Sequence, residues 1–155
     1  MCKSILAARL IVSAILALST GHEARAAEAE DNGIWQGSYD CTQGETLLRL
    51  TIGPERAQQR EAVFYFYPKQ GAPDRSSGCF SMTGRPVPGK EGWFLFSQKK
   101  WINQPPFYVM VDLIGRIDPD GGFEGVVHGP GCGRFTLKRM SDKADFPEAC
   151  IPMTQ

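Results

Sequence analysis

The chain has 155 residues, of which 42% are hydrophobic and 22% charged, and its formal net charge is zero. This length is typical of one domain; the composition is too apolar for a disordered protein, and 17 glycines and 11 prolines interrupt it too often for a helical bundle. The balanced charge also argues against a nucleic-acid-binding protein, which would carry a basic surface.

Residues 1–26 have the pattern of a secretory signal peptide. Lys3 and Arg9 form a positively charged stretch before a short apolar core, residues 10–18. Ala24 and Ala26 supply the small side chains that a signal peptidase recognises. Such a core is too short to span about 30 Å of hydrocarbon, so no membrane span is expected. We expect a periplasmic or secreted protein in which residues 27–155 form a single β-barrel domain.

Cysteine content supports export. Cleavage after Ala26 would remove Cys2 and leave an even number of cysteines, which predicts two disulfides in an oxidising compartment. Their spacing does not match the Cys-x-x-Cys pattern of zinc and redox sites, and it leaves all three possible pairings open. The four cysteines are Cys41, Cys79, Cys132 and Cys150.

Short runs of β-branched and aromatic residues alternate with turn-forming residues along the rest of the chain. Gly- and Pro-containing turns separate the runs, for example over residues 118–122. This pattern predicts an antiparallel, eight-stranded all-β meander, and closing it into a small disulfide-stapled barrel removes the exposed edges. The predicted strands are Ile34–Cys41, Thr46–Ile52, Glu61–Tyr67, Cys79–Arg85, Trp93–Ser97, Phe107–Gly115, Phe123–His128 and Arg134–Arg139.

Alternation along the strands predicts which side chains face inward. Leu48 and Leu50 point to one face and Arg49 to the other, as expected for a barrel with a filled interior. Two segments, 63–67 and 107–114, are apolar or aromatic on both faces or nearly so. Either a second layer covers their outer face, or these strands present aromatic side chains to a partner.

Residues suited to catalysis are few. His128 is the one histidine left after cleavage, and the thiols are expected to be oxidised, which removes the usual nucleophile–base pairs. An acidic cluster near Asp118 and Glu124 would suit a hydrolase, but residues 118–122 are better explained as a hairpin turn. The sequence has neither a Walker loop nor a histidine pair for a transition metal. We therefore predict no catalytic residue, no metal and no cofactor.

Two other features favour binding. Residues 33–39 resemble the Gly-x-Trp start of lipocalin- and avidin-type barrels, in which the Trp packs across the barrel floor. Residues 101–108 combine three aromatics with two prolines, which stiffen a loop so that its aromatic anchors lose little entropy on binding. The same loop could instead tuck Trp101 into the barrel mouth as a plug. The candidate binding residues are Trp101, Ile102, Asn103, Gln104, Pro106, Phe107 and Tyr108, with Tyr65 and Tyr67 from the earlier aromatic strand.

Three longer motifs resemble a known family. They are Trp35-x-Gly37-x-Tyr39-x-Cys41-x-Gln43-Gly44-x-Thr46, Trp101-Ile102-x-x-Pro105-x-x-Tyr108-x-x-Val111-x-Leu113-x-Gly115 and Gly125-x-Val127-x-Gly129-Pro130-Gly131-Cys132-x-x-Phe135-x-Leu137-x-Arg139. Together they resemble a small exported all-β module of α-proteobacteria that occurs alone or attached to caspase-like domains. The resemblance implies that Cys41 pairs with Cys132 and Cys79 with Cys150. It also implies Gly at position 107, where this chain has Phe, and it implies no particular activity.

A looser likeness is to the periplasmic inhibitors of c-type lysozyme, which are small disulfide-bonded barrels. Residues 77–81 share only the Ser-Gly of the Ser-Gly-x-x-Tyr pattern of their inhibitory loop and have Ser81 where that pattern has Tyr. We expect a non-catalytic exported protein with a protein partner, of inhibitor or immunity type, with a cell-wall-degrading enzyme as the target considered. The alternatives are a carrier of a small apolar ligand in the lipocalin or avidin manner, which requires an internal cavity, and a hydrolase using Asp118 and Glu124.

Overall fold

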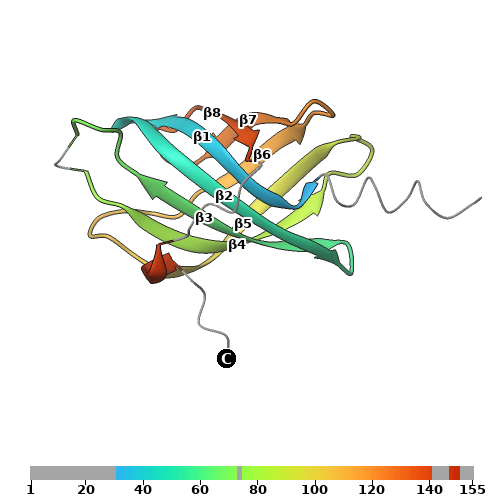
Figure 1. Ribbon diagram of the computed structural model, residues 1–155, viewed down its shortest axis with the longest axis horizontal. Helices are drawn as coiled ribbons and strands as arrows, with labels where there is room; N and C mark the ends of the chain where they lie inside the picture. Colours follow the sequence, from blue (N-terminus) through green and yellow to red (C-terminus); the bar gives the residue numbers. More distant parts are fainter. Residues whose placement is uncertain (1–30, 73–74, 141–146, 151–155) are drawn as a thin grey trace, which may run out of the picture.

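The protein is a closed antiparallel β-barrel in which each strand pairs with its neighbours in chain order (Figure 1). The computed structural model describes residues 31–72, 75–140 and 147–150. The expected eight-stranded barrel is confirmed; the expected signal peptide lies outside the described residues. The elements are β1 (Gly33–Cys41), β2 (Gly44–Arg56), β3 (Gln59–Tyr67), β4 (Gly78–Pro86), β5 (Trp93–Asn103), β6 (Asp112–Ile117), β7 (Gly122–His128), β8 (Arg134–Arg139) and a 3-10 turn, η1 (Glu148–Cys150).

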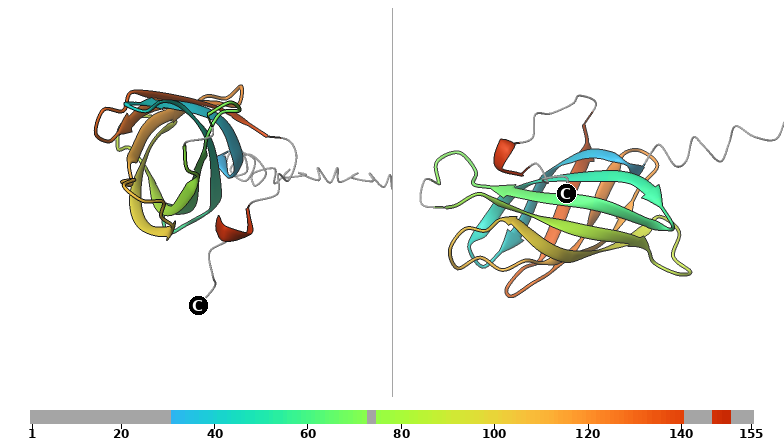
Figure 2. Two further views of the ribbon diagram at one scale, coloured as in Figure 1. Left: turned by 90° about the vertical axis from the view of Figure 1, so that its left-hand side faces the viewer. Right: turned by 90° about the horizontal axis from the view of Figure 1, so that it is seen from below.

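The barrel closes where β1 pairs with β8, and the strands then ring the interior (Figure 2, left). Gly37 lies opposite Leu137 in this pairing, and a Cβ atom at Gly37 would overlap the backbone carbonyl of Thr136. Glycine is therefore required at position 37, since any side chain would push the first and last strands apart.

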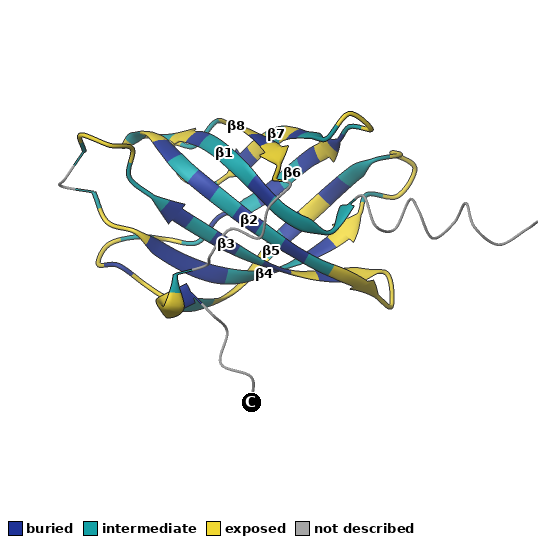
Figure 3. Cartoon of the chain, in the orientation of Figure 1, coloured by how far each residue is buried: buried dark blue, intermediate teal, exposed yellow. Residues whose placement is uncertain are grey.

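Inward-facing side chains fill the barrel, and buried positions alternate with more exposed ones along the strands (Figure 3). Trp35 is fully buried at the end where β1 begins, with its ring edge-on to Phe123 at 5.8 Å. The inward positions predicted from alternation are all buried, as are the other large side chains of the core: Leu48, Leu50, Ile52, Phe64, Phe66, Phe80, Met82, Phe96, Phe135 and Leu137.

One predicted strand is longer in the structure than in the sequence analysis. The strand expected to end at Ser97 continues as β5 to Asn103, because its pairing with β4 runs on through two irregularities of register. The polar residues 98–100, which indicated an end, are simply exposed on this strand. Trp101, Ile102 and Asn103 therefore belong to a strand, and their assignment to a loop was wrong.

The next predicted strand is shorter. It was expected to begin at Phe107, but β6 begins at Asp112 and residues 104–111 form a loop. Pro105 and Pro106 have no backbone N–H to donate to a ladder, and Phe107 has a left-handed φ of 66°, so the chain turns here. Below, "the loop" means residues 104–111.

Two disulfides staple the fold, and both follow the pairing implied by the family resemblance. Cys41–Cys132 joins the end of β1 to the turn between β7 and β8. Cys79–Cys150 fastens η1 against the outside of the barrel beside β4 and β5. Such bonds form and persist in oxidising, exported compartments. Across the described residues, no helix has the length and hydropathy needed to cross a membrane.

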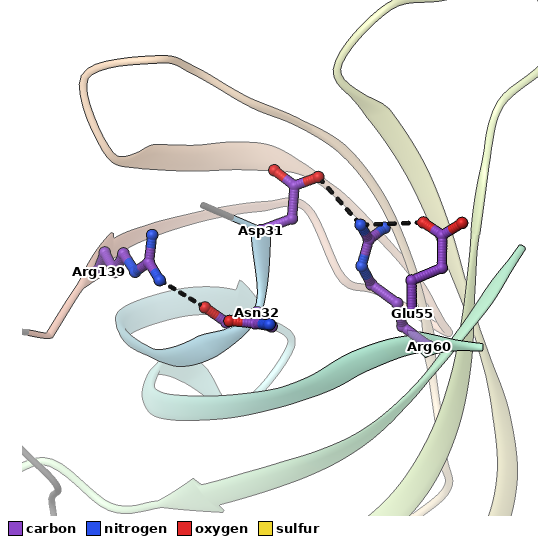
Figure 4. Close-up of polar contacts among 5 residues, drawn as sticks. All are labelled: Asp31, Asn32, Glu55, Arg60 and Arg139. Atoms are coloured by element: carbon purple, nitrogen blue, oxygen red, sulfur yellow. Dashed lines mark hydrogen bonds and ion pairs between the residues drawn. The ribbon is translucent and has the colours of Figure 1, made fainter. Parts of the chain in front are cut away.

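A buried ion network holds the chain where it enters the barrel (Figure 4). Arg60 is 4% exposed, and its Nη2 lies 3.3 Å from Asp31 Oδ2 and 3.1 Å from Glu55 Oε2. Its guanidinium also lies over the Phe94 ring, 5.0 Å from the centroid. The segment before β1 is thus tied to the end of the barrel opposite the turn that follows Cys41.

Candidate functional site

A cavity of about 350 Å³ opens at the end of the barrel where β1 ends. We call this end the mouth. Three connections surround it: the β1–β2 turn with Thr42 and Gln43, the β7–β8 turn with Pro130, and the loop with Phe107. The Cys41–Cys132 disulfide borders the cavity and ties the two turns together. The mouth is therefore assembled from segments far apart in the sequence.

Aromatic rings form the floor of the cavity. Phe64 and Phe80 are stacked, with centroids 4.7 Å apart and 15° between planes, and Tyr39 meets Phe64 edge-on at 5.6 Å. Burial raises the pKa of the Tyr39 phenol well above its ordinary value, and the hydrogen bond with the Thr46 side chain offsets this only in part. Tyr39 therefore stays neutral, and the floor offers ring surface with one uncharged hydroxyl.

A tight turn shapes the loop. The Tyr108 N–H donates to the Pro105 carbonyl at 3.4 Å, Pro106 occupies the second position and Phe107, in the third, has a φ of 66°. These are the features of a type II turn, whose third position favours Gly. The Gly that the family resemblance implies at position 107 would meet this requirement, whereas Phe is a conformational outlier there.

Both ends of the turn are anchored to the barrel. Pro105 is buried against Gly78, where a Cβ atom would lie 2.5 Å from its Cδ, and the Tyr108 ring stacks on Phe66 at 5.1 Å. The Gln104 side-chain amide donates to the Tyr108 carbonyl at 3.2 Å. Between these anchors Phe107 is fully exposed, and Val109, just after Tyr108, is 61% exposed. The loop thus holds two apolar side chains in solvent.

The other predicted binding residues divide between strand and loop. Trp101 is half-buried and packs edge-on against Phe80 at 5.2 Å and Phe66 at 6.3 Å, so it lies against the core beside the mouth. Ile102 and Asn103 continue β5, and Pro106 is exposed on the turn. Trp101 therefore neither projects as an exposed anchor nor lines the mouth cavity as a plug.

Tyr65 and Tyr67 lie apart from the mouth cavity, on the outer face of β3. Their rings are stacked at 5.0 Å, and the Tyr67 hydroxyl accepts a hydrogen bond from Gln36 Nε2 at 3.2 Å. Burial raises the pKa of Tyr65, and both side chains are half-buried. Together with Arg49, which donates to Gln36 Oε1 at 3.4 Å, they form a polar and aromatic network on the barrel wall.

Several residues of the mouth were not among the predicted binding residues. Thr42, Gln43 and Pro130 lie in turns whose sequence signals only the turn itself, and Val109 lay inside a predicted strand. Inward alternation did identify Phe64 and the other floor residues, but as core. Residues 78–81, compared above with an inhibitory loop, form the start of β4 instead.

Acidic residues considered for hydrolysis lie on the outer wall and at the end opposite the mouth. Asp118 forms an ion pair with Arg116 at 3.3 Å. Glu124 lies opposite Arg116 in the register of β6 and β7. Asp118 also borders a hollow at that end, and Lys138 and Arg139 of β8 are among the other residues that line it. Within the described ranges, no group of three or more His, Cys, Asp or Glu side chains is placed to hold a metal ion.

Comparisons with protein-family models, with curated proteins and with solved structures find no significant match for this chain.

Proposed function

We propose that this chain is a non-catalytic binding protein of the periplasm or the extracellular space, and that its partner is a protein docking on the mouth. The observation that carries the proposal is Phe107, a large apolar side chain that is fully exposed and held in a left-handed conformation. Such a conformation costs about 1–2 kcal/mol for an L-residue. Because the Phe107 ring is in solvent, its burial does not offset this cost in the free protein, whereas a partner that buries the ring would offset it.

The loop also meets the energetic requirement of a binding anchor. Pro105 and Tyr108 fix the backbone on both sides of Phe107, so little entropy remains to be lost on docking. Exposed Val109 and the aromatic cavity next to the loop provide further apolar area to be removed from water. A rigid projection of this kind is suited to entering the cleft of an enzyme, which supports an inhibitor-type role.

Affinity capture with matched variants tests the proposal. The wild-type protein, Phe107→Ala and Leu95→Ala serve as baits for an extract of envelope and secreted proteins; Leu95 is an exposed apolar residue on the outer wall of β5. Removal of a central aromatic anchor costs 2 kcal/mol or more, or about 30-fold in affinity. We expect a partner that the wild-type protein and Leu95→Ala retain and Phe107→Ala loses.

The narrower inhibitor role has its own assay. Purified protein added to cell-wall lysis by the captured partner should lower the rate in a saturable way, and Phe107→Ala should not. Equal recovery of every bound protein by the three baits would contradict docking at the mouth. A captured partner whose activity is unchanged by the wild-type protein would contradict inhibition alone.

A further inference from the structure

The mouth cavity has a binding chemistry separate from that of the exposed Phe107 ring. It sinks between the turns and the loop down to the rings of Phe64, Phe66 and Phe80, while Phe107 projects at the rim. A small-molecule carrier, the alternative derived from the sequence, requires a cavity of this kind. This chemistry belongs to the cavity alone and does not depend on a protein partner.

Size limits what the cavity holds. A dry apolar cavity of about 150 Å³ accommodates one benzene molecule. The mouth cavity measures about 350 Å³, which is roughly twice that volume and near the lower limit for ligand pockets. Its volume therefore suits a molecule of two fused rings, and it is too small to enclose a long acyl chain or a macrocycle.

The shape of the floor favours a flat ring. Two stacked aromatic pairs meet there, Phe64 with Phe80 at 4.7 Å and Phe66 with Tyr108 at 5.1 Å, each with 15° between the planes. Aromatic rings attract further rings in offset-stacked or edge-to-face arrangements. A planar aromatic ligand would thus extend an arrangement that the four side chains already form.

Among the residues that the structure describes, every one that borders the cavity is uncharged. Its polar groups there are neutral ones, among them the Tyr39 hydroxyl, the Thr42 hydroxyl and the Gln43 amide. A ligand carboxylate or ammonium buried here would lose its hydration with no opposite charge to replace it. A hydroxyl or carbonyl group, in contrast, has hydrogen-bonding partners within the lining.

We propose that the mouth cavity binds a small, uncharged, flat aromatic molecule of two fused rings. The test is an NMR titration of the amide resonances with 2-naphthol, and with 2-naphthoate as the charged compound on the same ring system. With 2-naphthol, Thr42, Gln43 and Val109 should shift together and saturate with a Kd on the order of 100 µM. With 2-naphthoate, the Kd should be at least about tenfold higher.

A matched pair of variants locates the site. Val109→Asp places a carboxylate at the rim, and Val126→Asp makes the same change on the outer wall of β7; both valines are exposed, so neither change threatens the core. Val109→Asp should raise the Kd for 2-naphthol at least about threefold, and Val126→Asp should leave it unchanged. Absence of saturable shifts at the mouth, equal affinity for the two naphthyl compounds, or equal weakening by the two variants would each overturn the proposal.

Discussion

The ring of Tyr108 lies 5.1 Å from the ring of Phe66, with 15° between their planes, and this stack fastens one end of the turn in the loop to the floor of the barrel mouth. Tyr108→Ala should lower the free energy of unfolding by about 1–2 kcal/mol, since a half-buried ring and its stacking are lost. It should also weaken partner binding by releasing the loop. Denaturant unfolding measures the first effect and capture of the partner the second.

Tyr67→Ala is the matched control for this change. It removes a half-buried tyrosine that also stacks on another ring, but on the outer wall. A similar loss of stability with unchanged binding would assign the binding effect of Tyr108→Ala to the loop. Equal binding by both variants would show that the stack does not orient the anchor.

Phe107→Gly separates stability from binding. Glycine relieves the left-handed strain, worth about 1–2 kcal/mol, and adds roughly 0.5–1 kcal/mol of unfolded-state entropy, so the variant should be more stable by about 0.5–1 kcal/mol. The same change deletes the proposed anchor. Phe107→Ala keeps the strain and deletes the ring, so it should lose binding without gaining stability. Thermal unfolding of the three proteins distinguishes these outcomes, and a less stable Phe107→Gly would refute the strain argument.

The Cys41–Cys132 disulfide should affect both stability and the mouth. Replacing both cysteines by serine opens a link across 91 residues and should cost about 2–5 kcal/mol. Because the bond borders the cavity, the amide resonances of Thr42 and Gln43 should also change. The double serine variant of Cys79 and Cys150, whose bond lies outside the barrel, should lose stability and leave those mouth resonances in place.

The raised pKa of Tyr39 predicts a loss of stability at alkaline pH. Its pKa is raised in the fold, while the unfolded chain has the ordinary value of about 10. The contribution of neutral Tyr39 to the free energy of unfolding is therefore complete below pH 10. It is lost at about 1.4 kcal/mol per pH unit as the pH rises from there toward the pKa of Tyr39 in the folded protein. Unfolding measured between pH 8 and 11 should show a shallower decline for Tyr39→Phe than for the wild-type protein. Parallel curves would contradict the assignment to Tyr39.

Gly37→Ala should be among the most damaging small substitutions. The added methyl group would overlap the Thr136 carbonyl at the seam between β1 and β8, and we expect a loss of at least about 2 kcal/mol. Gly122→Ala is the control, because the nearest atom to its Cβ would be Asp118 Oδ2, 3.8 Å away. Comparable stability of the two variants would show that the seam relaxes more easily than the backbone contact indicates.

Most of the barrel could be predicted because its strands follow local rules. Period-2 alternation identified the buried faces of Leu48, Leu50 and Phe64 without any knowledge of their partners. The errors lie at the ends of β5 and β6, where tertiary pairing overrides composition. The polar run 98–100 is held in a strand by β4, and the apolar run after Phe107 is turned away by two prolines and a positive φ.

The mouth could be predicted only in part, for a related reason. Phe107 and Tyr108 stood out as aromatics after prolines, which is a local signal. Thr42 and Pro130 join them only because the barrel closes and Cys41 bonds to Cys132, and no local pattern encodes that meeting. A cavity formed by several turns depends on side-chain volumes and loop paths, which alternation does not report.

The salt bridge from Asp31 to Arg60 has a practical consequence for the orientation of the molecule. Because this contact lies at the end of the barrel opposite the mouth, a tether joined close before Asp31 would start from the end farther from the proposed binding face. η1, in contrast, is bonded through Cys150 to Cys79 near the mouth end of β4. A tether joined close before Asp31 would therefore start farther from the mouth than one joined close after Cys150.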